Sequence, residues 1–474
     1  MISDTGDLVI GTVRGAVRGV AEGGALAYRG IPFAASPVDK LRFAPPQPHP
    51  GWTGVREAVR SGPSAPQWPS RLESVMGTRI PDWDEDGCLN LNVWAPAESE
   101  GPLPVLLWFH GGGFTSGSGG WDWYDGSRLA ALGDIVVVTA NYRLGPLGYL
   151  YLPEADAVNL GACDQAAALR WVAENIAAFG GDPARITVGG QSAGAFSALA
   201  LACDPATGSL VRRVIAQSGP WRMPPQDPAK AEDIAAAYLR VLGLEDGAGE
   251  RLRELPVSRL LAAYARLMAD TGRPGSMEPP MWPVLGGPGT PRLFEDAIAS
   301  GALAGKEVLL GWTGNEMGAF FAFNPAIRML SRGEAAALLG VEAESELFAA
   351  GDPAQAVSAA LGERFFASGA RELADGLAAQ GNPTYLYRFD RGPVPDPNGI
   401  GACHCAELPF LFGTFDHFPD APMLGEIRAG DRELATVFGG ALATFVATGS
   451  PTGARLPAWR PYRAGSAADI ARFG

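Results

Sequence analysis

Residues 186–202 read ITVGGQSAGAFSALALA and contain the pattern G-x-S-x-G at Gly190–Gly194. A short apolar run precedes this pattern, and a small-residue stretch typical of a helix follows it. The two glycines allow a sharp backbone turn that would leave the oxygen of Ser192 exposed at the end of a strand. The alternative is a glycine-rich turn in which Ser192 only caps a helix. The strand–turn–helix context favours a nucleophile at Ser192.

Short apolar runs rich in Val, Ile and Leu recur along the chain and are typical of strands buried on both faces. They lie at Val105–Phe109, Ile135–Ala140, Ile186–Val188, Val214–Ala216, Val308–Leu310 and Tyr385–Phe389. Helical patterns separate several of them, and Asp164–Phe179 is the clearest because its apolar residues share one face. This alternation predicts an α/β fold with a mostly parallel central sheet and helices on both faces.

No charged or Gly/Ser-rich linker divides the 474 residues into independent halves, so we expect one domain over residues 1–474. Two stretches near residues 225–290 and 317–381 read mainly as helices without strands. We expect them to be helical insertions over the active site. The first 100 residues hold many Gly and Pro and predict short antiparallel strands with long loops.

The formal net charge of −14 argues against nucleic acid or an anionic membrane as a partner and leaves neutral or cationic small molecules open. The N-terminal segment has no apolar core of a signal peptide, and no apolar run is long enough to span a membrane. The five cysteines form no C-x-x-C pair. We therefore expect a cytoplasmic monomer or small homo-oligomer without a cofactor or metal.

A second glycine-rich stretch, HGGGF at His110–Phe114, directly follows the strand-like run LPVLLWF. Loops of this type supply backbone donors to the oxyanion in enzymes that use a G-x-S-x-G serine. Only glycines let several N–H groups approach a developing alkoxide. We expect the donors to be the amides of Gly112, Gly113 and Ala193. A phosphate-binding loop is disfavoured because the G-K-[ST] sequence of a Walker motif is absent here.

A nucleophilic serine needs a base, and the chain has four histidines, His49, His110, His404 and His417. In α/β-hydrolases the acid and the histidine follow the serine along the chain. This order leaves His404 and His417. His404 follows the strand-like run TYLYRF, whereas His417 lies in TFDHFP, which is typical of a surface turn. We favour His404 as the base.

The acid that orients the histidine should follow a strand of the sheet. Glu316 comes a few residues after Val308–Leu310 and fits this spacing. Asp390 and Asp296 remain alternatives on spacing alone. Asp390 would place acid and histidine on the same connection, which is less usual.

These motifs resemble those of the type-B carboxylesterases, which include bacterial p-nitrobenzyl esterases and cholinesterases. The likeness runs nearly end to end, in family order. It is carried by GIPFAASPVDKLRFAPPQP (30–48), EDGCLNLNVW (85–94), NYRLGPLGYL (141–150), the stretch from residue 159 to 195, WTGNEMGAFF (312–321) and GACHCAELPFLFG (401–413). The resemblance implies the α/β-hydrolase fold and a serine carboxylic-ester hydrolase that needs no cofactor.

By that resemblance Ser192, Glu316 and His404 fall on the nucleophile, acid and base, and Gly112, Gly113 and Ala193 fall on the oxyanion donors. Ser218 falls on a serine that the family places near the triad. Two positions depart from the family. Gln191 replaces the common Glu before the serine, and Ala65 stands where the family has the cysteine that pairs with the one matching Cys88.

Aromatic residues lie close to these motifs in the sequence, and we expect some of them to line a pocket for apolar acyl or aryl groups. The candidates for substrate binding are Trp121, Trp123, Trp221, Phe320 and Phe321. Small apolar or aryl esters are the expected substrates. An amidase or carbamate hydrolase with the same triad is the first alternative. A non-catalytic, neuroligin-like binding protein is the second, although such proteins lack the nucleophile.

Overall fold

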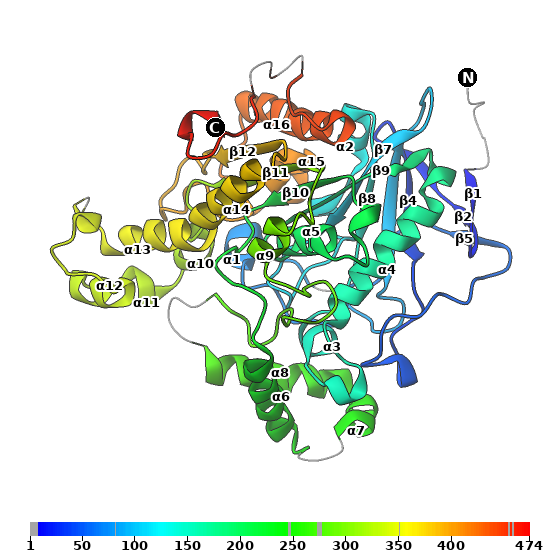
Figure 1. Cartoon of the computed structure of the whole chain (residues 1–474), viewed down its shortest axis with the longest axis horizontal. Helices are drawn as coiled ribbons and strands as arrows, with labels where there is room; N and C mark the ends of the chain where they lie inside the picture. Colours follow the sequence, from blue (N-terminus) through cyan, green and yellow to red (C-terminus); the bar gives the residue numbers. More distant parts are fainter. Residues whose placement is uncertain are drawn as a thin grey trace.

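A ten-stranded mixed sheet runs through the centre of the molecule (Figure 1). The computed structural model describes residues 8–80, 82–244, 248–272, 277–349, 351–453, 456 and 459–474. The strands follow the spatial order β13 (Ile470–Phe473), β12 (Thr384–Phe389), β11 (Glu307–Thr313), β10 (Arg213–Gln217), β9 (Gly181–Gln191), β7 (Leu103–Phe109), β8 (Val136–Ala140), β6 (Asn90–Pro96), β4 (Ala25–Pro32) and β3 (Val20–Glu22).

The seven strands from β13 to β8 are all parallel to their neighbours, whereas β6, β4 and β3 add antiparallel strands at one edge. The predicted mostly parallel sheet is therefore confirmed, and each of the six predicted apolar runs lies in one of its strands except for Ile135, which directly precedes β8. A small second sheet is made of β1 (Val9–Thr12), β2 (Gly15–Arg18) and β5 (Val55–Glu57). Of the strand pairs in the first 100 residues, β1–β2, β3–β4 and β4–β6 are antiparallel as expected, whereas β2 and β5 are parallel.

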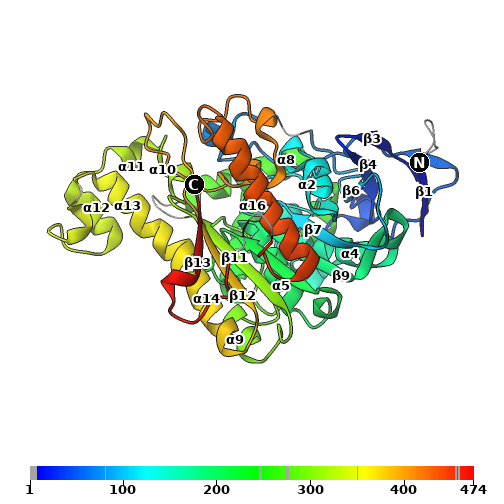
Figure 2. The same ribbon diagram turned by 90° about the horizontal axis from the view of Figure 1, so that it is seen from above.

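Helices cover both faces of the sheet, as the strand β7 illustrates. Val105, Leu107 and Phe109 point into one hydrophobic core, and Leu106 and Trp108 point into the other. The first core is closed by α4 (Leu160–Asn175), α5 (Ala193–Cys203), α9 (Phe294–Ala299) and α14 (Ser368–Ala379), and the second by α2 (Ser127–Gly133), α15 (Leu408–Phe412) and α16 (Ala429–Thr448). Figure 2 shows α16 lying across the sheet.

Two groups of helices extend away from this layered body (Figure 1). The first group comprises α6 (Pro228–Leu242), α7 (Ala248–Glu254) and α8 (Val257–Thr271), and the second comprises α10 (Gly318–Phe321), α11 (Pro325–Arg328), α12 (Arg332–Leu339) and α13 (Pro353–Gly362). They fall within the stretches near residues 225–290 and 317–381. The second group has its own small core around Phe348 and Phe366.

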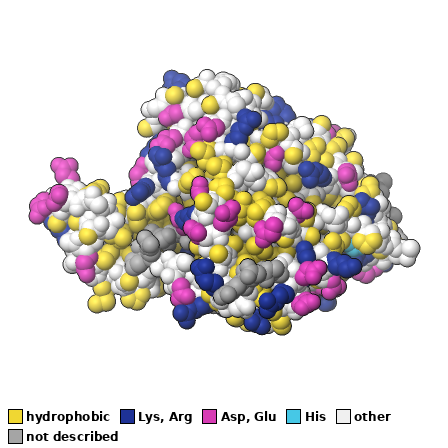
Figure 3. Space-filling view, turned by 60° about the horizontal axis from the view of Figure 1, so that its bottom comes forward, with side chains coloured by type: hydrophobic (Ala, Val, Ile, Leu, Met, Phe, Trp, Pro, Cys, Tyr) yellow, Lys and Arg dark blue, Asp and Glu magenta, His cyan; other side chains and the backbone are white. Residues whose placement is uncertain are grey.

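The described surface mixes charges of both signs. On the face in Figure 3, acidic and basic side chains are interspersed around hydrophobic ones and form no patch of a single sign. Within the described parts of the chain, no helix is both long and apolar enough to cross a membrane.

A buried ion pair fastens α4 to the loop after β8. Arg143 Nε lies 2.8 Å from Asp164 Oδ2, and its Nη2 lies 2.7 Å from Oδ1. The amide of Arg143 also donates to Asp164, and its Nη1 donates to the carbonyl of Ala44. The two side chains are 2% and 0% exposed. Each charge is therefore compensated only by the other and by these hydrogen bonds.

We predict that Asp164→Asn lowers the free energy of unfolding by about 3–5 kcal/mol, because it leaves the Arg143 guanidinium buried without a counter-charge. Urea denaturation followed by circular dichroism measures the change. The control is Asp270→Asn, which breaks the exposed pair between Asp270 and Arg266 and should cost less than about 1 kcal/mol. Equal effects of the two substitutions would contradict this account of the pair.

Candidate active site

The loops that follow three parallel strands bring the predicted site residues to one edge of the sheet. His110–Phe114 follows β7, Ser192 follows β9 and Glu316 follows β11. The loop with His404 joins them through a bridge between Asn315 and Cys403. The amide of His404 donates to the carbonyl of Glu316 at 3.3 Å. Ligand sites of open α/β sheets lie at this carboxyl edge.

The backbone of Ser192 has φ +58° and ψ −123°, a conformation that residues with a side chain rarely adopt. The residues two positions before and after it must be glycines for steric reasons. A Cβ on Gly194 would lie 2.0 Å from the carbonyl oxygen of Phe109, and a Cβ on Gly190 would lie 2.3 Å from the backbone of Gly194. The amide of Ser192 donates to the carbonyl of Gln217 at 2.8 Å, which ties the turn to the next strand. This strained turn has the geometry that the G-x-S-x-G pattern predicts for a nucleophile elbow.

Three backbone amides face the same side of this turn without a partner. The N–H groups of Gly112, Gly113 and Ala193 form no hydrogen bond with any residue that the structure describes. Gly112 and Gly113 have φ values of +116° and +60°, and a Cβ on Gly112 would lie 1.9 Å from the carbonyl oxygen of Ser116. Unpaired, fixed amides at a helix N-terminus and a glycine loop can stabilise an oxyanion.

A side-chain clamp fixes the far end of this glycine loop. The carboxamide of Gln67 accepts from the amide of Gly117 at 2.7 Å and donates to the Gly117 carbonyl at 2.8 Å. Both groups are buried. The loop conformation is thus held before any substrate arrives, so the amides need no reorganisation during a reaction.

His404 and Glu316 form a short, buried contact. Nδ1 of His404 lies 2.6 Å from Oε2 of Glu316, and both side chains are 1% exposed. The other carboxylate oxygen accepts from the amide of Thr313 at 2.7 Å. The contact assigns the proton on Nδ1 to the bond with Glu316 and leaves Nε2 as the acceptor. The alternative acid Asp390 instead pairs with Arg388 and Arg472.

Gln191 contacts the reactive nitrogen of this histidine. Its Nε2 lies 3.1 Å from Nε2 of His404, while its Oε1 accepts from the thiol of Cys405 at 3.5 Å. The hydroxyl of Ser192 forms no hydrogen bond with the described residues. The amide of Gln191 therefore occupies the nitrogen to which the serine would donate. Hydrogen bonds of this kind are often misaligned in unliganded enzymes and form when substrate binds.

Two of the other histidines can be excluded as the base by their surroundings. His110 stacks on Tyr142 at 4.4 Å, and its Nδ1 contacts the carbonyl of Gly111 at 2.8 Å. Burial lowers the pKa of His110 to about 4, so this ring is neutral at neutral pH and serves the loop structure. The side chain of His417 is 43% exposed near Asp122 and does not line the cavity described below.

A second buried carboxyl lies behind the triad residues. Burial, assisted by the charge of Glu316, raises the pKa of Glu407 to about 8. The hydroxyl of Ser218 donates to Glu407 at 3.5 Å. Ser218 thus contacts this carboxyl, and no hydrogen bond joins it to Ser192, His404 or Glu316. Glu407 is therefore mostly protonated at neutral pH.

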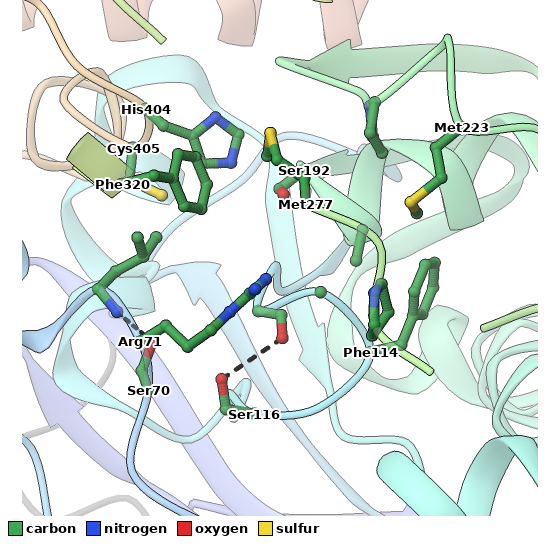
Figure 4. Close-up of a pocket in the computed structure, with 16 residues that line it drawn as sticks. Ser70, Arg71, Phe114, Ser116, Ser192, Met223, Met277, Phe320, His404 and Cys405 are labelled. Atoms are coloured by element: carbon green, nitrogen blue, oxygen red, sulfur yellow. Dashed lines mark hydrogen bonds between the residues drawn. The ribbon is translucent and has the colours of Figure 1, made fainter. Parts of the chain in front are cut away.

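A cavity of about 560 Å³, counting the part open to solvent, contains Ser192 and His404 (Figure 4). Most of its wall is apolar. It is lined by Ser70, Arg71, Leu72, Gly112, Gly113, Phe114, Ser116, Ser192, Ala193, Pro220, Met223, Met277, Pro279, Phe320, His404 and Cys405. The nucleophile, the histidine and the three free amides therefore share one space.

Of the five aromatic residues expected to bind substrate, Phe320 lies in this lining. The other four residues do not line this cavity. Trp121 packs edge-on against Trp123 in the core on one face of the sheet, and Trp221 packs against Phe294 on the other. Phe321 belongs to the small core of the second helical group. Nearness in sequence to a motif does not fix the direction of a side chain, and large aromatic residues are more often buried among others.

Sequence reasoning missed several lining residues. Arg71, Met223 and Met277 come from irregular segments without a recognisable motif. The contact of Gln191 with His404 was also missed, although its position next to Ser192 offered a signal. All five cysteines are free thiols, and Cys405 lies in the cavity wall.

We predict that Glu407→Gln raises the melting temperature more at pH 8 than at pH 5. A carboxyl with a raised pKa stabilises the fold below its ordinary pKa of 4.5 and loses that contribution as the pH rises toward about 8. Glutamine carries no such penalty, so the difference between variant and wild type should grow over this window and then level off. Scanning calorimetry measures it, with Glu174→Gln at an exposed site of α4 as control. A difference that does not vary with pH would contradict the shifted pKa.

Comparisons with known proteins agree with this geometry. The family model described as "Carboxylesterase family" matches residues 5–471. The chain is 37% identical to phenmedipham hydrolase of Pseudarthrobacter oxydans, over 96% of this chain and 92% of that protein. It is also 37% identical to para-nitrobenzyl esterase of Bacillus subtilis, over 94% and 90%. A thermophilic p-nitrobenzyl esterase structure has a TM-score of 0.82 at 37% identity and covers 95% of this chain and 92% of its own. The resemblance is confirmed: this chain belongs to the carboxylesterase family.

Proposed function

We propose that this carboxylic-ester hydrolase uses Ser192 as nucleophile, His404 as base and Glu316 as the acid that orients His404. Small apolar or aryl esters are the proposed substrates. The observation that carries the proposal is the 2.6 Å contact of Glu316 with His404, which lines the same cavity as Ser192. The apolar wall formed by residues such as Phe114, Phe320 and Met277 supports the substrate class.

In the first half of the reaction, His404 Nε2 takes the proton of the Ser192 hydroxyl as its oxygen attacks the ester carbonyl. Glu316 holds the imidazole in the required tautomer and stabilises the imidazolium that forms. The carbonyl oxygen becomes an oxyanion that accepts from the amides of Gly112, Gly113 and Ala193. Removing one donor of this kind costs about 3–4 kcal/mol of barrier in studied hydrolases.

Collapse of this intermediate expels the alcohol, which takes its proton from the His404 imidazolium. An acyl group then remains on Ser192. Water attacks this acyl-enzyme with His404 again as base, and the same three amides stabilise the second oxyanion. The carboxylic acid leaves, and the proton returns to the Ser192 oxygen.

The resting contact of Gln191 must change for this cycle to start. His404 Nε2 can accept from Ser192 once it no longer accepts from the Gln191 amide. We propose that substrate in the cavity, by excluding water around Ser192, favours the productive bond.

A reducing, cytoplasmic setting is part of the proposal. It is supported by the five free thiols, four of them buried. Burial raises the pKa of the thiols, including that of Cys405 in the cavity wall. They remain protonated at neutral pH and are poor competitors of Ser192 as nucleophiles.

We predict that Ser192→Ala and His404→Ala each lower kcat for p-nitrophenyl butyrate by about 10⁶-fold, because loss of either group removes proton transfer and attack together. Glu316→Gln should lower it by about 10⁴-fold through loss of the correct tautomer. Release of p-nitrophenol measures the rates. Labelling by a fluorophosphonate probe should disappear in Ser192→Ala.

The matched controls are substitutions of the alternative base and the alternative acid that the sequence left open. His417→Ala and Asp390→Asn should keep nearly wild-type kcat, because both lie outside the cavity. A strong loss in either control, with retained activity in His404→Ala or Glu316→Gln, would refute the assignment. Comparing kcat/KM on an ester, an amide and a carbamate of matched size tests the preference for esters.

A further inference from the structure

One permanently charged side chain stands in the wall of an otherwise apolar cavity. Arg71 lines it beside the glycine loop, and Nη2 lies 3.4 Å from the place that a Cβ on Gly113 would take. Figure 4 shows the side chain extending from the segment with Ser70 into the cavity, toward the side where Ser192 lies. The guanidinium is therefore close to an amide that the proposed mechanism uses for the oxyanion.

This guanidinium has no counter-charge. Arg71 forms no hydrogen bond or ion pair with the part of the chain that the structure describes, and the described lining contains no Asp or Glu. Its titratable neighbour is Tyr264, whose pKa is raised by burial, so the phenol is uncharged at neutral pH. By contrast, the mostly buried side chains of Arg42, Arg143 and Arg391 each pair with a carboxylate.

The surroundings of Arg71 are mostly apolar. The side chain is exposed to solvent, yet protein surrounds the guanidinium closely enough that desolvation lowers its pKa. An arginine nevertheless stays protonated at neutral pH, because its ordinary pKa lies far above neutral pH. An unpaired guanidinium in a mostly apolar cavity wall offers an anionic group of a ligand a charged hydrogen-bond partner. The planar guanidinium fork matches the two oxygens of a carboxylate.

We propose that Arg71 binds a carboxylate of the substrate, so that the preferred ester carries a free carboxylate within a few bonds of the carbonyl that Ser192 attacks. This inference rests on the proposed function and narrows its substrate class. It also departs from the expectation of neutral or cationic substrates that the net charge of −14 suggested. The local charge of the cavity decides recognition here, because the long-range field of exposed charges is screened by salt.

The test compares anionic esters with their neutral methyl esters in wild type and Arg71→Met. One pair carries the carboxylate on the acyl side, as 4-nitrophenyl hydrogen glutarate and methyl 4-nitrophenyl glutarate. The other carries it on the alcohol side, as 4-butyryloxybenzoate and its methyl ester. Release of nitrophenol or hydroxybenzoate gives kcat/KM. Methionine keeps an unbranched apolar stem and lacks the guanidinium, so the charge and its donors are lost.

The substitution should lower kcat/KM for the anionic member of one pair by roughly 10- to 100-fold, as expected for loss of hydrogen bonds to a charged group. The neutral member should change by less than about threefold. The pair that responds identifies the side of the ester on which the carboxylate lies. Arg71→Lys, which keeps the charge without the fork, should fall between wild type and Arg71→Met on the same substrate.

The control is Arg222→Met. Arg222 is an exposed arginine that pairs with Glu372 and directly precedes Met223, a residue of the lining. This substitution should leave the ratio of kcat/KM for the anionic and the neutral ester unchanged in both pairs. Equal losses of anionic and neutral substrates in Arg71→Met, or no loss of either, would overturn the carboxylate site. Failure of wild type to hydrolyse any of the four esters would be a different result, because it would overturn the proposed function itself.

Discussion

The backbone at Ser192 is the constraint on which the candidate site depends. A residue other than glycine adopts a φ of +58° only where the surrounding structure imposes it. Here the end of β9 and the start of α5 press against the end of β7, and only the missing side chains of Gly190 and Gly194 permit that contact. The same close approach places the amide of Ala193 beside the glycine loop after β7. One steric arrangement therefore sets both the proposed nucleophile and its proposed oxyanion donors.

Electrostatics of the interior then define the roles of the ionisable groups. Two carboxyls, Glu316 and Glu407, are buried near one histidine. Burial raises the pKa of Glu407 to about 8, so it is mostly neutral at pH 7, whereas Glu316 is held by the amide of Thr313 and by His404. The two carboxyls thus lie in different environments, and the shift of Glu407 follows from its burial.

Much of this arrangement could be predicted from the sequence, because it depends on backbone sterics and strand order. The patterns around Ser192 and Gly112 require glycine at fixed positions, and the apolar run of β11 places Glu316 at the proper edge. The pocket wall could not be predicted in the same way. Trp121 and Trp221 lie close to motifs in the chain but point into cores, and Arg71 enters the cavity from an irregular segment. Side-chain direction in such segments is fixed by tertiary packing, which periodicity does not encode.

The most direct test of the central claim is a crystal structure of the enzyme after reaction with a small alkyl phosphonate. The account predicts a covalent bond from phosphorus to Ser192 Oγ, with the phosphoryl oxygen within hydrogen-bond distance of the amides of Gly112, Gly113 and Ala193. It also predicts that His404 Nε2 has left the Gln191 amide and faces the Ser192 oxygen. A phosphoryl oxygen turned away from these amides, or a histidine that still contacts Gln191 alone, would contradict it.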